Sequence, residues 1–259
     1  SRWPSCSLVW PLSPFVPKRF GPYTLLRPVG QGGMAEGFLA QAVGLEGFER
    51  LLCVKRVLDE HSNDTELIDH LVDEAKLVSR ISHPNVAQVF DLGRVGEQFY
   101  IAMEWIDGVD ALKLLEACEQ REIHVPIAAA AYIVREIARG LEAAHTTTDE
   151  EGRPLGIVHR DVTPTNVLLS LEGQVKLIDF GVAKNILRSR QTAVGVVKGK
   201  YSYLAPEQAR GETVDARADV FAAGILLYEL LVGEPLYPGT KAADVVAKAR
   251  AAKIPSLRK

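Results

Sequence analysis

The sequence is poor in cysteine and nearly balanced in charge. Its 259 residues include three cysteines, Cys6, Cys53 and Cys118, which are far apart and form neither a CxxC pair nor a cluster with histidine. This scarcity disfavours a disulfide framework and a zinc site, and it favours a reducing, cytoplasmic location. The net charge is -3, so no basic excess indicates nucleic acid as a partner.

Long hydrophobic runs are also missing. The longest, from Val220 to Val232, is interrupted by Glu229 and is too short to span a bilayer, so we expect no membrane segment in this chain. The opening SRWPSCSLVWPLSPFVP is broken by proline and lacks the charged region that begins a signal peptide. We therefore expect residues 1–19 to be a disordered leader.

Strand-like and helix-like patterns occupy different parts of the chain. Strands are predicted in YTLLRPVGQGGMAEGFLAQAV, in RLLCVKRVL, and over residues 86–93 and 99–105. One helix, NDTELIDHLVDEAKLVSRI, lies among them, with Asn63 and Glu66 in capping-box spacing. After Gly108 the predicted elements are helices, over residues 111–119, 127–146, 220–231 and 242–252. The pattern predicts an α+β protein with a small β-rich lobe and a larger helical lobe.

The segment GQGGMA, which contains Gly30, Gly32 and Gly33, lies between two predicted strands. Glycines allow backbone N–H groups to approach phosphate oxygens, but an ordinary hairpin turn has the same composition. A dinucleotide-binding loop is disfavoured because a strand, not a helix, follows.

Lys55 lies in the middle of a predicted strand, where a lysine commonly faces solvent. The following helix changes this interpretation, because Glu74 shares the apolar stripe formed by Leu67, Leu71 and Val78. A carboxylate on a core-facing stripe is costly unless it is paired. Lys55 is the natural partner, in a functional or a purely structural ion pair.

Oxygen-bearing side chains gather in HRDVTPTN and LIDFGVAK, which contain Asp161, Asn166 and Asp179. Hard oxygen ligands suit Mg²⁺, and Asp161 could instead accept a proton from an attacking hydroxyl. Turn formation is the ordinary explanation for any one of these residues, but it does not account for all three at these spacings.

Taken in order, these motifs resemble those of the eukaryotic-like serine/threonine protein kinases of bacteria, from about Phe20 to the end of the chain. The order is glycine loop, strand lysine, helix glutamate, HRDVTPTN, DFG at 179–181, APE at 205–207 and DARADVFAAG. The resemblance implies a two-lobed protein-kinase-like fold, with an N-lobe that contains one key helix over residues 20–106 and a C-lobe over 107–259. The family continues with further helices, so we expect this catalytic domain to be truncated and Glu207 to lack its arginine partner.

The resemblance also implies individual roles. Lys55 would hold the α- and β-phosphates of ATP and pair with Glu74, while Asp161 would be the catalytic base. Asn166 and Asp179 would hold Mg²⁺. The nucleotide site would also include the glycine loop, the gatekeeper Met103, the hinge from Glu104 to Ile106 and the ribose contact Asp110; Asp219 would brace the catalytic loop.

Four positions depart from the family pattern. Ala35 replaces a loop glycine, and Gly37 replaces the valine over the adenine, which predicts ATP binding weaker by about 1–2 kcal/mol. Thr163 replaces the catalytic-loop lysine, while Lys200 replaces a threonine that faces it in the family. We therefore interpret Thr163 and Lys200 as an exchange that keeps one ammonium and one hydroxyl at the site, although Lys200 could simply face solvent.

The predicted function is transfer of the γ-phosphoryl group of ATP, with Mg²⁺, to Ser or Thr hydroxyls of protein substrates. The alternative is a pseudokinase scaffold that binds partners without turnover. Ser189 and Thr192, between DFG and APE, are candidates for autophosphorylation, and a phosphate there could pair with Arg160. An unmodified loop is the other possibility.

Overall fold

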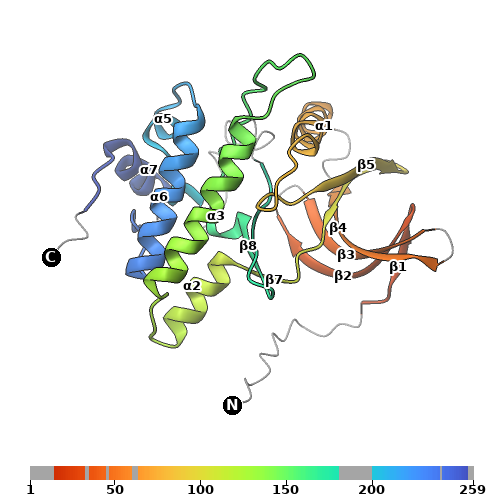
Figure 1. The fold of residues 1–259 in the computed structure, drawn as a ribbon, viewed down its shortest axis with the longest axis horizontal. Coiled ribbons are helices and arrows are strands. Elements are labelled where there is room, and N and C mark those ends of the chain that lie inside the picture. Colours follow the sequence, from red (N-terminus) through yellow and green to blue (C-terminus); the bar gives the residue numbers. More distant parts are fainter. Residues whose placement is uncertain are drawn as a thin grey trace. The chain divides into compact units, whose positions relative to one another are not determined.

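The computed structural model describes residues 15–32, 35–44, 47–59, 64–180, 200–239 and 241–255 (Figure 1). The chain divides into two compact units, one of residues 1–63 and 90–105 and the other of residues 64–89 and 106–259. The first is built on a β-sheet and the second is mainly helical, so the predicted α+β class is confirmed.

The first unit contains a six-stranded sheet with the order β1-β2-β3-β4-β6-β5. Its strands are β1 (Lys18–Phe20), β2 (Tyr23–Gln31), β3 (Ala35–Val43), β4 (Glu49–Val57), β5 (Val89–Val95) and β6 (Gln98–Glu104). The five strands from β2 to β6 correspond to predicted ones, since runs of β-branched and apolar residues between glycine-rich turns mark each of them.

Strand β1 was not predicted, and it begins within the stretch expected to be a disordered leader. Phe15, just before it, packs against the sheet's apolar cluster, with its ring centroid 5.9 Å from that of Phe38. Burial of this aromatic ring offsets the entropy lost on ordering residues 15–19. Residues 1–14 lie outside the described part of the chain.

The register of the sheet assigns its side chains to two faces. Phe38, Val54 and Ala102 are cross-strand neighbours in the buried cluster on one face. The next row joins Gly37, Lys55 and Ile101. Because successive residues of a strand point to opposite faces, Lys55 projects from the face opposite to this cluster.

The second unit contains the α-helices of the described residues and a small sheet of order β7-β8-β9 (Figure 1). The helices are α1 (Thr65–Ser79), α2 (Ala111–Gln120), α3 (Ile127–His145), α5 (Pro206–Arg210), α6 (Ala216–Val232) and α7 (Ala242–Ala251). The strands are β7 (Gly108–Asp110), β8 (Val167–Ser170) and β9 (Val175–Leu177), and short 3-10 helices cover Pro164–Asn166 and Lys200–Tyr203. No helix in the described ranges has both the length and the apolar character needed to cross a bilayer.

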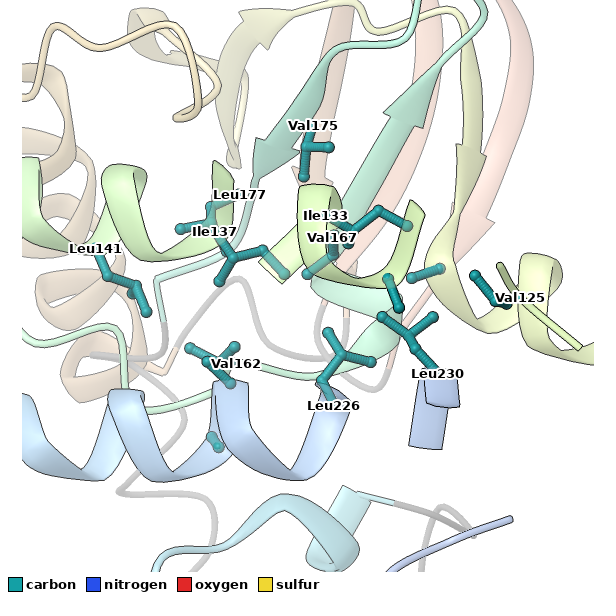
Figure 2. Close-up of a cluster of buried hydrophobic side chains, with 14 residues drawn as sticks. Val125, Ile133, Ile137, Leu141, Val162, Val167, Val175, Leu177, Leu226 and Leu230 are labelled. Atoms are coloured by element: carbon teal, nitrogen blue, oxygen red, sulfur yellow. The ribbon is translucent and has the colours of Figure 1, made fainter. Parts of the chain in front are cut away.

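A large apolar core lies where α3, α6 and strands β8 and β9 meet (Figure 2). Ile137 of α3 and Leu226 of α6 are fully buried in it. Val162, which follows Asp161 in the chain, lies between these two helices and is 1% exposed. Burial of one such valine contributes about 1.5–3 kcal/mol, so the core anchors the loop that carries Asp161.

A second core joins the end of α1 to the loops beside the HRD and DFG motifs. It includes Val78, Ile81, Ile157 and Phe180, all buried. The predicted apolar stripe of α1 is thus confirmed at Val78.

Candidate active site

Asp161 lies in a buried loop of the second unit and is held by Asn166. Asn166 Nδ2 donates to the Asp161 carbonyl oxygen at 2.8 Å and to its Oδ2 at 2.9 Å. The 3-10 turn over Pro164–Asn166 makes this return possible, since the Asn166 backbone N–H bonds the Thr163 carbonyl at 2.9 Å. The five-residue spacing between Asp161 and Asn166 therefore allows the Asn166 amide to fold back onto Asp161.

Asp219, 1% exposed at the start of α6, holds the residues before Asp161. Its Oδ2 accepts from the backbone N–H of His159 at 2.8 Å, and its Oδ1 accepts from that of Arg160 at 2.7 Å. His145 Nε2 lies 2.8 Å from the same Oδ2. These hydrogen bonds offset the cost of burying the carboxylate. They also put Asp219 where the resemblance implied that it would brace the catalytic loop. The contact with His145 was not predicted.

The loop with Asp179 is bonded to the Asp161 loop through its neighbours. The Ile178 N–H donates to the Asn166 carbonyl at 3.0 Å, and His159 Nε2 lies 3.1 Å from the Ile178 carbonyl. The buried Phe180 ring packs at 4.4 Å, between centroids, from the His159 ring. Asn166 and Asp179, the two proposed metal ligands, thus belong to two adjoining segments.

The donor set fits Mg²⁺. Because the Asp161 carbonyl can only accept, its contact fixes Nδ2 of Asn166 toward Asp161, and the amide oxygen Oδ1 remains as the possible ligand. Asp179 adds a carboxylate, and hard oxygen atoms are the ligands that Mg²⁺ prefers.

Thr163 is 5% exposed, and its hydroxyl lies 2.9 Å from that of Thr165. No local sequence pattern indicated Thr165 as the partner of Thr163. Lys200 begins the second 3-10 helix, but its side chain is outside the described residues, as are Ser189 and Thr192. The exchange between Thr163 and Lys200 therefore stays a prediction.

In the first unit, Lys55 and Met103 lie on one face of the sheet. Met103 pairs with Cys53 on β4, two residues from Lys55, and Gly37 pairs with both Lys55 and Gly30. Gly32 closes the turn between β2 and β3 by donating to the Ala35 carbonyl at 2.8 Å. Gly33 and the Glu74 side chain lie outside the described residues, so the pair between Lys55 and Glu74 stays a prediction.

The missing side chain at Gly37 is partly replaced by Val29. A Cβ built on Gly37 would lie 3.2 Å from Val29 Cγ2, closer than ordinary van der Waals contact. Val29 therefore leans over the Gly37 backbone, on the face of the sheet that carries Lys55.

The remaining predicted nucleotide contacts are Glu104, at the end of β6, and two residues of the second unit. Ile106 is 9% exposed. Asp110 caps α2, because its Oδ1 accepts the Lys113 backbone N–H at 2.8 Å while Lys113 Nζ lies 3.4 Å from Oδ2. An Asp directly before an amphipathic helix is a common capping signal, so this role of Asp110 could have been predicted from the sequence.

A buried carboxylate near the end of α6 also escaped prediction. Glu229 is 4% exposed and accepts a hydrogen bond from the Tyr203 hydroxyl. Burial raises the pKa of Glu229 to about 7, an effect that the Tyr203 hydrogen bond partly opposes, and it also raises the pKa of Tyr203. Glu229 had been noted only as an interruption of an apolar run.

Sequence comparison matches residues 23–258 to the family described as "Protein kinase domain". The chain belongs to this family. Protein kinases generally use ATP and Mg²⁺. The match covers both units, and it includes every motif residue named above.

Individual kinases show how far the likeness extends. The chain is 46% identical to the "Tyrosine-protein kinase MasK" of Myxococcus xanthus over 212 residues, 82% of this chain and 33% of that protein. It is 33% identical to the "Serine/threonine-protein kinase PrkC" of Bacillus subtilis over 239 residues, 92% of this chain and 35% of that protein. The chain therefore spans about a third of the length of the curated relatives it matches.

Among solved structures, the PknI kinase domain of M. tuberculosis is similar, with a TM-score of 0.64 at 29% identity. That comparison covers 84% of this chain and 75% of the other. The likeness agrees with a protein kinase fold for the chain.

Proposed function

We propose that this chain is the catalytic domain of an ATP-dependent serine/threonine protein kinase. The observation that carries the proposal is the loop around Asp161. This carboxylate is buried, bonded to Asn166 and placed on a backbone held by Asp219, in a chain of the protein kinase family. Such fixed geometry is what a general base requires.

Each polar residue has a defined task in the proposed reaction. Asp161 accepts the proton of the substrate hydroxyl as that oxygen bonds to the γ-phosphorus and the bond to the β,γ-bridging oxygen breaks, which releases ADP. Lys55 binds the α- and β-phosphates. Asn166 and Asp179 would hold Mg²⁺, which offsets the negative charge of the transferring group.

The finer assignments belong to the same proposal. The lobes would span residues 20–106 and 107–259, with Met103, Glu104, Ile106 and Asp110 around the nucleoside. Glu74 would pair with Lys55, and Ser189 or Thr192 would accept phosphate in trans or in cis. A cytoplasmic location and protein rather than nucleic-acid substrates fit the three widely spaced cysteines and the net charge of -3.

Tyrosine is a second candidate acceptor. A relative with 46% identity is named a tyrosine-protein kinase, and Thr163 stands where serine/threonine kinases commonly carry lysine. Three relatives with 33–34% identity, among them PrkC of Bacillus subtilis, are named serine/threonine kinases, one of them as probable, which is why Ser and Thr remain the first proposal. None of these names supports the pseudokinase alternative.

Incubation with radiolabelled ATP, beside an Asp161→Asn control, tests the activity. Phosphoamino acid analysis of the product then separates Ser and Thr from Tyr. Label in the wild type alone supports the kinase, and absence of label from a folded wild type would contradict it.

A further inference from the structure

Arg160, directly before Asp161, has both backbone polar groups held by side chains of two different helices. Its N–H donates to Asp219 Oδ1 of α6 at 2.7 Å, and its C=O accepts from Gln208 Nε2 of α5 at 2.9 Å. Its φ of 63° lies in the left-handed region, where a residue with a Cβ is strained. Such a conformation persists only where the surroundings enforce it, and these two contacts do so.

The contact with Gln208 fixes the peptide plane that leads into Asp161. The C=O of Arg160 and the N–H of Asp161 belong to one planar unit. Gln208 binds its carbonyl end, while the amide end points to His159 Nδ1 at 3.3 Å. Because this plane sets the direction of the Asp161 Cα–Cβ bond, a tilt of the plane would displace the carboxylate.

We propose that Gln208 is a positioning residue for the catalytic base Asp161, a role that rests on the kinase function proposed above. The hydrogen bonds of the Gln208 side chain to described residues go to the Arg160 carbonyl and the Ala205 N–H, so Gln208 would act on Asp161 through the Arg160 backbone.

The two ends of the Gln208 amide have separate tasks. Its Oε1 accepts from the Ala205 backbone N–H at 3.0 Å, which closes the first turn of α5. That N–H can only donate and the Arg160 carbonyl can only accept, so the two partners fix the orientation of the amide. A carboxylate could satisfy Ala205 but would place a second acceptor against the carbonyl.

Gln208 thereby connects the base to α5. That helix is itself held by α7, since Arg250 Nε donates to the Ala209 carbonyl at 2.7 Å. The chain enters α5 from the 3-10 helix at Lys200–Tyr203. A displacement of that 3-10 helix would therefore move α5, and the Gln208 side chain would transmit the movement to the Arg160 backbone and so to Asp161.

Gln208→Glu tests the proposal. The variant keeps the contact with Ala205 and loses only that with Arg160, so its melting temperature should fall less than that of a variant that loses both contacts. Its kcat should fall about tenfold or more at about pH 8, the scale of a misplaced catalytic group, while KM for ATP stays unchanged. At about pH 5 the introduced carboxyl begins to protonate and can donate to Arg160 again, so the kcat ratio to wild type should recover.

Two further variants make the result specific. Gln208→Ala loses both contacts, so its melting temperature and kcat should fall and acid should not rescue kcat. Gln174→Glu makes the same chemical change at an exposed position and should match the wild type. The proposal is wrong if Gln208→Glu keeps kcat within about twofold at about pH 8, or if its loss is the same at both pH values.

Hydrogen exchange separates this inference from the proposed activity. If the folded wild type transfers no phosphate, the kinase proposal fails. The amide protons of residues 159–161 should still exchange at least about tenfold faster in Gln208→Glu than in the wild type or in Gln174→Glu, because the plane is released. Equal exchange in all three proteins would overturn the positioning role.

Discussion

Tyr203 donates its hydroxyl proton to the buried carboxylate of Glu229, which ties the 3-10 helix before α5 to α6. Desolvation is the largest influence on this carboxyl and raises its pKa to about 7. A carboxyl that is easier to protonate in the folded than in the unfolded protein stabilises the fold below its unfolded pKa. That stabilisation is lost as the pH rises through about 7.

Glu229→Gln should therefore remove the part of the loss in folding stability at rising pH that comes from this carboxyl. The wild type should lose on the order of 3 kcal/mol from this group between about pH 5 and pH 8, whereas an uncharged amide can still accept from Tyr203 at all pH values. Melting temperatures measured across this range should converge at the acid end and favour the variant at the alkaline end. Parallel curves for the two proteins would contradict the assignment.

Asp219 and Asp215 offer a matched comparison at the start of α6. Asp219→Ala leaves two backbone N–H groups, those of His159 and Arg160, without their acceptors, and should cost about 3 kcal/mol or more. Asp215→Ala removes an exposed helix cap, with a cost of about 1 kcal/mol. Urea denaturation measures the free energy of unfolding of both variants. Equal losses of stability would show that the contacts of Asp219 with the catalytic loop contribute no more than an ordinary helix cap.

The sequence allowed the elements of both units to be predicted wherever the periodicity was strong. Strands β2 to β6, with the turn glycines around them, and helices α2, α3 and α7 have the expected type and nearly the expected ends. Strands β7 to β9 were missed because each has only three or four residues, too few to show an alternation. The start of α6 was also missed, because Asp219 interrupts its apolar pattern for a reason that only the folded loop reveals.

The motif residues of the site could be predicted from the sequence, but the residues that hold them in place could not. HRDVTPTN indicated Asp161 and Asn166, and the structure shows the bond between them. The bonds of Gln208 to Arg160 and of His145 to Asp219 join residues 48 and 74 positions apart, and no local pattern encodes such contacts.

Lys55→Met should abolish phosphoryl transfer with little effect on folding. Lys55 lies on the face of the sheet opposite to the apolar cluster, so the methionine displaces no core side chain. The loss should exceed a factor of about 10² in kcat/KM, because the lysine is assigned to the phosphates. Lys18→Met, at an exposed position on β1 of the same sheet, is the control. Activity of Lys55→Met within a few fold of the control would refute the role of Lys55.

Exchange of Thr163 and Lys200 provides the final prediction. Thr163 is buried two residues after Asp161, and its hydroxyl already has a partner in Thr165, so this position supplies no charge to the site. If Lys200 supplies that charge, Lys200→Ala should lower kcat by about 10² or more, the scale of losing one electrostatic stabiliser. Thr163→Lys combined with Lys200→Thr should recover much of this loss, because one ammonium and one hydroxyl are kept, whereas either change alone should not. Steady-state kinetics of these variants beside the wild type decides the matter: near-normal turnover of Lys200→Ala, or a double variant as inactive as the singles, would show that the two positions do not exchange roles.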